Sequence, residues 1–327
     1  MKTALYWESY KDKIKCLLCP HFCIITAGSS GLCKVRKNID GELVSTIFGE
    51  ATSIALDPVE KKPLYHFYPG SKILSAGTNG CNFSCQFCQN WEISQNSDSG
   101  RQDISAAELI NTALKARALG IAYTYNEPFV WFEFVLETAQ KAKKAGLKNV
   151  LVTNGYVNRA PLRELLPFID AMNIDLKAFK ESFYKNICNG GVEAVKNTIK
   201  ESFKQCHIEL TNLLIPSLND TEKELQDMAE WIASISPDIP VHLSRYFPYH
   251  KMTTGATTEK SLLNARAILS KALRYVYLGN TNIEGSGLTR CHKCNKPIAD
   301  RTGYSFRSLN LVKGKCGYCG NPVYGKY

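Results

Sequence analysis

The clearest pattern along the chain is an alternation of short apolar runs with amphipathic segments. The apolar runs are rich in β-branched and aromatic residues, and they occur at 73–78, 121–125, 149–154, 171–176, 207–215 and 241–247; the run 275–279 is a candidate seventh strand. Strands that alternate with helices predict right-handed crossovers and a parallel sheet. The pattern alone leaves two architectures open, a full or partial barrel and an open doubly wound sheet.

The predicted helices have recognisable boundaries. Ser105 and Glu108 have the spacing of a capping box, and Thr221 and Glu224 repeat it. Pro161 suits a first helical turn. The helix over about 129–145 ends before Gly146, the residue type that favours a helix C-terminus.

The segments before and after this alternating region differ from it. Residues 1–50 hold a first group of cysteines and look loop-rich, and residues 51–70 contain three prolines, as an extended connector would. We divide the chain into a cysteine-rich metal-binding extension (1–50), a domain of alternating strands and helices (51–285) and a basic tail (286–327).

The composition fits an ordinary globular protein more readily than a membrane or secreted protein. Of 327 residues, 44% are hydrophobic and 21% charged, which allows a sizeable core. No run approaches the ~18 apolar residues of a membrane span, and the N-terminus lacks a secretory signal, so we expect a cytoplasmic protein without membrane contact. The thirteen cysteines then suggest metal sites rather than disulfides. Cys188 and Cys206 stand apart and are expected to be ordinary reduced thiols.

Three cysteines directly follow the first predicted strand. This central triplet (Cys81, Cys85 and Cys88) has the spacing C-x3-C-x2-C. Three thiolates this close can bind three irons of a 4Fe–4S cube, whereas ordinary cubes have four cysteine ligands. Since no fourth cysteine follows nearby, one iron is open to an external ligand, such as the amino and carboxylate groups of S-adenosylmethionine (SAM). The alternative is a zinc knuckle that takes its fourth ligand from elsewhere.

The string CNFSCQFC resembles the signature of the radical SAM superfamily. The strings CPHFC, DPVEKKPLYHFYPGS, CQNWEISQ, TYNEP, VTNGY, NIDLK and IPSLND, together with the terminal CxxC pairs, extend the resemblance to nearly the whole chain. Together they resemble the radical SAM component of the AmmeMemoRadiSam system, which is related to the enzymes that activate pyruvate formate-lyase. The resemblance implies an α/β fold, a partial (β/α)6 TIM-like barrel, with its ligands at the C-terminal ends of the strands.

The resemblance also implies which residues bind SAM. Phe87 takes the aromatic position near the adenine, and Glu127 the place of an acid that contacts the SAM amino group. The family has two glycines before that acid, where this chain has Tyr125 and Asn126, and we include Asn126 among the candidate SAM-binding residues. The remaining candidates follow later strands and lie near the methionine carboxylate or the nucleoside: Thr153, Asn154, Asp175, Lys177 and His250. For Asp175 and the other barrel charges, ion pairing with one another is the alternative. For Glu127 the alternative is a surface position, and for His250 a structural or solvated role.

Two further cysteine groups flank the barrel. The terminal quartet (Cys291, Cys294, Cys316 and Cys319) forms two CxxC knuckles, which predicts a zinc ribbon, with rubredoxin-like iron as the competing metal. The front quartet (Cys16, Cys19, Cys23 and Cys33) matches neither a ferredoxin run nor two clean knuckles. It is expected to hold zinc or a second 4Fe–4S cluster, and the sequence does not decide between them.

These motifs lead to one main function and two alternatives. The main prediction is a radical SAM oxidoreductase whose cluster reductively cleaves SAM to a 5′-deoxyadenosyl radical, which abstracts hydrogen from an unidentified substrate. An electron donor such as flavodoxin or ferredoxin is implied, and the subfamily suggests Memo-like and AMMECR-like partners. The first alternative is a glycyl-radical-enzyme activase. The second is a zinc-ribbon nucleic-acid-binding protein, because residues 290–327 carry eight Lys and Arg against one acid and offer Tyr304, Phe306, Tyr318 and Tyr324 for base stacking.

Overall fold

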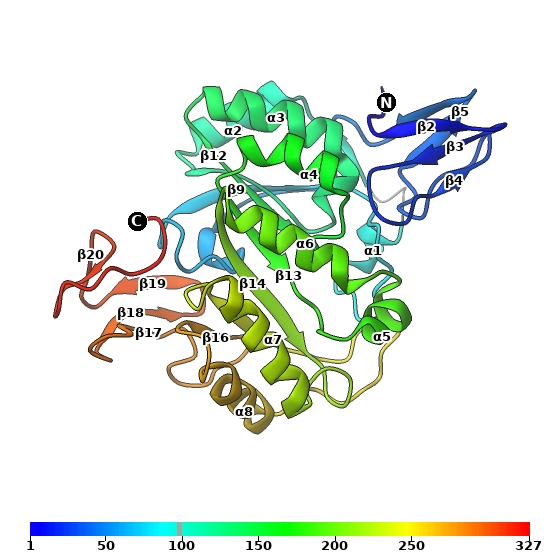
Figure 1. Cartoon of the computed structure of the whole chain (residues 1–327). Helices are drawn as coiled ribbons and strands as arrows, with labels where there is room; N and C mark the ends of the chain where they lie inside the picture. Colours follow the sequence, from blue (N-terminus) through cyan, green and yellow to red (C-terminus); the bar gives the residue numbers. More distant parts are fainter. Residues whose placement is uncertain (97–99) are drawn as a thin grey trace.

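An eight-stranded sheet forms the centre of the molecule (Figure 1). The computed structural model describes residues 1–96 and 100–327. Seven strands run parallel in the order of the sequence, and β8 pairs antiparallel with β9 at one edge. The strands are β8 (Ser53–Pro58), β9 (Lys72–Gly77), β11 (Gly120–Tyr123), β12 (Lys148–Thr153), β13 (Ala171–Asp175), β14 (His207–Leu214), β15 (Val241–Arg245) and β16 (Val276–Gly279). Within the described part of the chain β8 and β16 are the sheet's two edges, so the barrel is partial.

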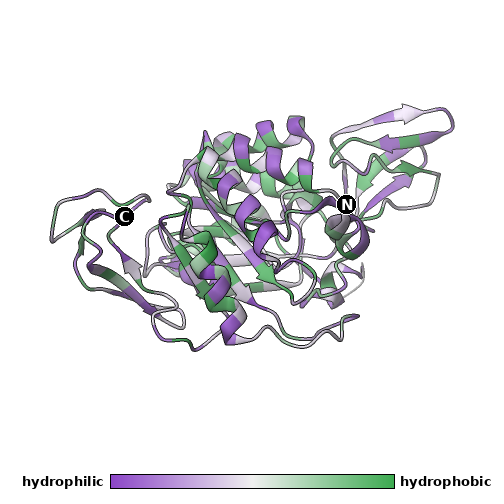
Figure 2. Cartoon of the chain, turned by 60° about the horizontal axis from the view of Figure 1, so that its bottom comes forward, coloured by the Kyte–Doolittle hydropathy of each residue, from purple (hydrophilic) through white to green (hydrophobic). Residues whose placement is uncertain are grey.

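Helices connect consecutive parallel strands and cover the outer face of the sheet. They alternate hydrophilic and hydrophobic positions (Figure 2), and their buried positions face the sheet. The main helices are α2 (Ala106–Lys115), α3 (Phe132–Lys144), α4 (Arg159–Leu165), α6 (Val192–Phe203), α7 (Glu222–Ile235) and α8 (Glu259–Leu269). Six β–α units followed by β16 confirm the partial (β/α)6 barrel and the candidate seventh strand.

Most helix boundaries in the structure agree with those predicted from the sequence. The Ser105 hydroxyl and the Glu108 carboxylate form the reciprocal capping box, and Gly146 follows α3 with φ of +78°. The second box is only half formed. Thr221 accepts from the Glu224 amide, but the Glu224 carboxylate accepts instead from the Phe179 amide at 2.9 Å, because α7 packs against that loop.

Residues 1–50 are more ordered than expected. They form two small antiparallel sheets, one of β1 (Lys2–Thr3), β6 (Glu42–Ser45) and β5 (Arg36–Ile39), the other of β2 (Trp7–Tyr10), β3 (Lys13–Cys16) and β4 (Ile24–Ile25). The strands are too short to show a periodicity in the sequence. Arg36 fixes the unit to the barrel through an ion pair with Glu133 of α3 at 2.9 Å, with both side chains almost fully buried.

The predicted connector 51–70 is likewise partly regular, since it contains β8 and a short 3-10 turn, η1 (Val59–Lys61). Pro58 is the last residue of the edge strand, where a missing N–H costs no ladder bond.

The tail packs against the barrel on the side opposite the N-terminal sheets (Figure 1). It contains β17 (Thr289–Arg290), β18 (Pro297–Thr302), β19 (Ser305–Ser308), β20 (Leu311–Val312) and β21 (Lys315–Cys316). The Lys326 amide donates to the His66 carbonyl at 2.8 Å, so the last residues run beside the segment between η1 and β9. In the described residues, no helix is long and apolar enough to cross a membrane.

Candidate functional site

The central triplet lies on the loop that follows β9, at the C-terminal end of the parallel strands. This loop requires glycine at two points. A Cβ on Gly77 would approach the Thr124 carbonyl oxygen to 2.4 Å, and Gly80 has φ of +88°. The side chain of Asn126, on the neighbouring strand end, clamps the loop by accepting from the Thr78 amide at 3.1 Å and donating to the Gly80 carbonyl at 2.8 Å.

Polar groups surround the sulfurs of the triplet. The Phe83 amide and the Asn154 side-chain amide donate to Cys81 Sγ at 3.4 and 3.6 Å, and Cys88 Sγ lies 3.2 Å from Ser94 Oγ. Donors of this kind stabilise thiolates and tune the potential of an iron–sulfur cluster. The three thiols also face one cavity, so the donor set fits a 4Fe–4S cluster with an iron accessible from that cavity.

Cys188 is closer to this loop than the sequence suggested. The Ser84 amide donates to the Cys188 carbonyl at 2.9 Å, and a hydrogen bond from the Cys188 thiol lowers the pKa of Cys85. Cys188 ends a π-helical turn, η4 (Tyr184–Cys188), and such turns recur at functional sites.

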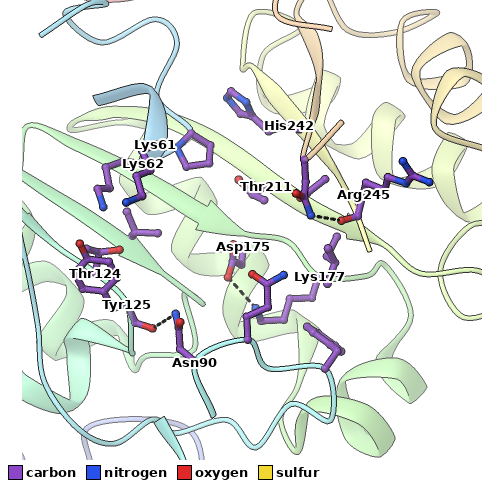
Figure 3. Close-up of a pocket in the computed structure, with 18 of the residues that line it drawn as sticks. Lys61, Lys62, Asn90, Thr124, Tyr125, Asp175, Lys177, Thr211, His242 and Arg245 are labelled. Carbon is purple, nitrogen blue, oxygen red and sulfur yellow. Dashed lines mark hydrogen bonds and ion pairs between the residues drawn. The ribbon is translucent and has the colours of Figure 1, made fainter. Parts of the chain in front are cut away.

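A cavity of about 1000 Å³ extends from the triplet through the mouth of the barrel (Figure 3). It is large enough for SAM together with a second small molecule or a peptide segment. Seven of the eight residues proposed for SAM line it: Phe87, Asn126, Glu127, Thr153, Asn154, Asp175 and Lys177.

Glu127 is the most constrained of these residues. Its carboxylate accepts from Thr153 Oγ1 at 2.7 Å, from the Asn154 amide at 2.8 Å and from the Phe129 amide at 3.1 Å. Its burial raises the pKa of Glu127 to about 7, against the effect of these donors. A carboxylate has about four acceptor positions, so one remains for a ligand.

Asp175 and Lys177 form an ion pair at 2.8 Å that faces the cavity (Figure 3). Burial alone would lower the pKa of Lys177, but Asp175 and the thiols of Cys85 and Cys188 raise it well above its usual value. The ammonium lies 5.7 Å from the centre of the Phe87 ring. The pair therefore connects Phe87, on the loop of the central triplet, with the end of β13.

His250 lies elsewhere. It stacks on Trp91 with ring centres 5.0 Å apart, and it is not among the residues that line the cavity. Its proposed contact with the nucleoside stays a prediction that the geometry does not favour.

Several residues that line the cavity were not predicted from the sequence. Lys61 and Lys62 both pair with Asp57 at 2.9 Å, and Asp57 also accepts from the Tyr125 hydroxyl at 2.9 Å. Arg245 ends β15 and enters the cavity lining. A charged residue at the end of a barrel strand is a signal that could have identified Arg245, whereas the lysines depend on β8, which the sequence did not reveal.

The tail also contributes to the cavity, through Arg301, Gly303 and Tyr304. Arg301 is 5% exposed, and its guanidinium donates to Thr289 Oγ1 at 2.8 Å and to the carbonyl oxygens of Gly287 and Tyr65. The β18–β19 hairpin is therefore part of the wall of the site.

The terminal quartet forms a tight tetrathiol group. Its four sulfurs lie within 4.8 Å of one another, with Cys291 Sγ to Cys319 Sγ at 3.6 Å and Cys294 Sγ to Cys316 Sγ at 3.7 Å. Tetrahedral zinc with Zn–S bonds of about 2.3 Å places its sulfurs about 3.8 Å apart. The sulfur positions thus suit a single tetrahedral ion.

The front quartet is also gathered in one place. Burial raises the pKa of Cys19 to about 12, and the nearby thiols of Cys33, Cys16 and Cys23 add to this rise. Cys16 and Cys33 are buried, and Cys19 and Cys23 are half-buried. The quartet sits where the N-terminal sheets meet the barrel.

Comparison with known proteins agrees with this geometry. The model of the radical SAM superfamily matches residues 76–232. The uncharacterized protein MJ0808 of Methanocaldococcus jannaschii is 37% identical over 332 residues, covering 99% of each chain. MJ1632 of the same organism, provisionally named a glycyl-radical enzyme activating enzyme, is 26% identical over 68% of this chain and 83% of its own.

Two further similarities are more distant. The pyruvate formate-lyase 1-activating enzyme of Escherichia coli is 22% identical over 53% of this chain and 72% of its own. A radical SAM methyltransferase from Sphaerobacter thermophilus has a TM-score of 0.51 and 15% identity, covering 84% of this chain and 75% of its own, which concerns the fold alone.

Proposed function

The chain belongs to the radical SAM superfamily, and from this premise we propose that it cleaves SAM reductively at a 4Fe–4S cluster held by Cys81, Cys85 and Cys88. The observation that carries the proposal is the convergence of the three thiols and seven of the eight SAM candidates on one cavity. When bound, the cluster supplies one electron to SAM, and the 5′-deoxyadenosyl radical so formed abstracts hydrogen from the substrate. The electron comes from a carrier such as flavodoxin or ferredoxin.

The residues of the chain bind and orient SAM in this proposal. Glu127 accepts an N–H of the SAM amino group with its remaining acceptor position, and its negative charge makes this a charge-assisted hydrogen bond. Asn126 acts indirectly by holding the loop of the triplet through the Gly80 carbonyl. Lys177 offers an ammonium to the SAM carboxylate, and Phe87 lies beside the adenine.

The experiment that tests this function is SAM cleavage by anaerobically reconstituted protein. With dithionite as reductant, wild-type protein should release 5′-deoxyadenosine from SAM. Absence of the nucleoside from protein that holds a full cluster would count against the proposal.

A second candidate is a glycyl-radical-enzyme activase, in which the substrate is a backbone glycine of another protein. The relationship to MJ1632 and to the Escherichia coli activating enzyme favours it, and a cavity of about 1000 Å³ leaves room for a peptide loop beside SAM. Coexpression with a glycyl-radical enzyme of the same organism tests it. A glycyl radical doublet in the EPR spectrum supports activation. SAM cleavage without that doublet means that the coexpressed enzyme is not the substrate.

At a finer level we assign the chain to the AmmeMemoRadiSam system, on the strength of its sequence strings. This assignment makes Memo-like and AMMECR-like proteins its expected partners and the cytoplasm its expected location. Copurification of tagged protein with either partner under anaerobic conditions would support it.

Nucleic-acid binding is the weaker alternative for the tail. Of the four aromatic residues considered, Tyr324 stacks on His207 with ring centres 5.0 Å apart, and Phe306 lies 5.3 Å from the Arg301 guanidinium. Tyr304 and Tyr318 remain as exposed rings. We propose instead that the terminal quartet holds structural zinc, which stabilises a hairpin that forms part of the cavity wall.

A further inference from the structure

The front quartet contacts the loop of the central triplet, which is the proposed site of the catalytic cluster. A Cβ built on Gly80 would lie 2.7 Å from the Cys33 carbonyl oxygen, so the two backbones are in direct contact. Gly80 immediately precedes Cys81. With consecutive Cα atoms 3.8 Å apart, this contact places the Cα atoms of Cys33 and Cys81 roughly 10 Å apart at most.

A second contact joins the same two regions. The ring of His21, which lies between Cys19 and Cys23, forms a hydrogen bond through Nε2 with the Asn82 carbonyl oxygen at 2.7 Å. Asn82 in turn accepts from the Asn154 side chain at 2.8 Å, and that same amide donates to Cys81 Sγ. Hydrogen bonds on the carbonyl and on the side chain of Asn82 therefore connect His21, which lies between two cysteines of the front quartet, with Asn154, whose amide donates to Cys81 Sγ.

The sulfur spacing separates the front quartet from the terminal quartet. Within the described residues, the tight grouping in which all donor atoms lie within 4.8 Å of one another is found at the terminal quartet and not at the front quartet or the central triplet. A single ion requires such close sulfurs. A cube requires wider ones, because each cysteine binds a different iron. The sulfurs of the front quartet are thus less tightly grouped than those of the terminal quartet, as the ligands of a cube would be, and the front quartet supplies the four thiolates that an ordinary 4Fe–4S cluster takes.

The outer side of the front quartet is open to a partner. Three apolar side chains next to its cysteines in the sequence are between 44% and 54% exposed: Phe22, Ile24 and Leu32. Lys15 lies 5.6 Å from the centre of the Phe22 ring. An external electron carrier can approach the quartet here, while the barrel covers its inner side.

We propose that the front quartet holds a second 4Fe–4S cluster, which relays single electrons from an external carrier to the catalytic cluster. The proposal rests on the SAM cleavage proposed above, since it names the route by which that site is reduced. In each relay the carrier is oxidised by one electron, the front cluster passes from the 2+ to the 1+ state and back, and the catalytic cluster passes from 2+ to 1+. No bond forms or breaks, and no proton moves.

Iron content and EPR test the cluster itself. Wild-type protein reconstituted with iron and sulfide should hold about eight irons per chain, as expected for two cubes. The triple variant of Cys81, Cys85 and Cys88 to Ala leaves the front quartet intact, so it should retain about four irons and a reduced-cluster EPR signal that SAM does not change. Zinc in place of iron in this variant overturns the proposal.

The relay is tested with the variant Cys19→Ala/Cys33→Ala, which keeps the central triplet. Its remaining cluster should still change its EPR signal on SAM addition, but its reduction by reduced flavodoxin should be at least about tenfold slower than in the wild type, because the intermediate site is lost. Cys206→Ala, at a thiol distant from both clusters, is the control. A wild-type reduction rate in the double variant overturns the relay.

The failures of the two proposals are distinguishable. Wild-type protein with two clusters but no 5′-deoxyadenosine contradicts SAM cleavage and leaves the cluster assignment standing. If the double variant does not fold, the triple variant still decides whether the front quartet binds iron, and the potentials of its single cluster decide whether flavodoxin can reduce it.

Discussion

Thr153 Oγ1 donates a hydrogen bond to Glu127 Oε1 at 2.7 Å and thereby joins the ends of two neighbouring strands. Glu127 is therefore a structural acceptor as well as a proposed acceptor for the SAM amino group. The two roles differ in what they require, because the strand ends need only acceptors, whereas the bond to the SAM amino group is strengthened by the negative charge. Substitutions that keep the shape but remove the charge separate them.

Glu127→Gln should weaken SAM binding about tenfold to a hundredfold while the iron content stays that of the wild type. The loss corresponds to about 1.5–3 kcal/mol for a hydrogen bond to a charged group, and Glu127 is not an iron ligand. A SAM titration followed by the EPR signal of the reduced cluster measures it. Glu137→Gln, on the solvent side of α3, is the control, and wild-type affinity in Glu127→Gln would leave Glu127 with a structural role only.

SAM affinity should also depend on pH. Burial raises the pKa of Glu127 to about 7, so the free protein carries a neutral carboxyl below this pH and a carboxylate above it. The carboxylate accepts from the SAM amino group more strongly than the neutral carboxyl does, and hence the dissociation constant of SAM should rise as the pH falls from about 8 to about 6. In Glu127→Gln this dependence should disappear. An equal pH dependence in both proteins would assign it to another group.

Zinc in the tail can be tested without removing the tail. Cys294→Ser should lower the zinc content by about one ion per chain, because tetrahedral zinc needs all four thiolates of the terminal quartet. Metal analysis of purified protein measures this, with Cys206→Ser as the matched control. An unchanged zinc content, or iron in its place, would contradict a zinc ribbon.

Arg301 should be a main stabilising contact between the tail and the barrel. Arg301→Ala removes the donor of three buried acceptors and should lower the free energy of unfolding by about 2–4 kcal/mol. Arg307→Ala removes an exposed ion pair with Asp300 and should cost less than about 1 kcal/mol. Chemical denaturation compares the two. Equal effects would mean that the tail is only loosely attached.

The sequence predicted the parallel sheet because its strands are long enough to show a pattern, and the resemblance to the radical SAM superfamily then favoured a barrel over an open sheet. The apolar runs from Ile73 to Gly279 alternate with capped helices, and each became a strand of the parallel sheet. Residues 1–50 escaped prediction because strands of two to four residues, such as Ile24–Ile25, carry no periodicity and depend on pairing between distant segments.

The residues of the candidate site could be proposed from the sequence where they follow a motif. The central triplet and Glu127 belong to strings read directly from the sequence. Lys62 and Arg301 enter the cavity through tertiary contacts, from an unexpected edge strand and from a hairpin of the tail. His250, by contrast, was proposed from its place after a strand, but its ring is not among those that line the cavity.

The most direct measurement of the central claim is 5′-deoxyadenosine production by anaerobically reconstituted protein with dithionite and SAM. The wild type should form the nucleoside, and the variant with Cys81, Cys85 and Cys88 replaced by Ala should form none, even though the terminal quartet remains intact. Nucleoside from the triple variant at the wild-type rate would show that SAM cleavage does not take place at the central triplet.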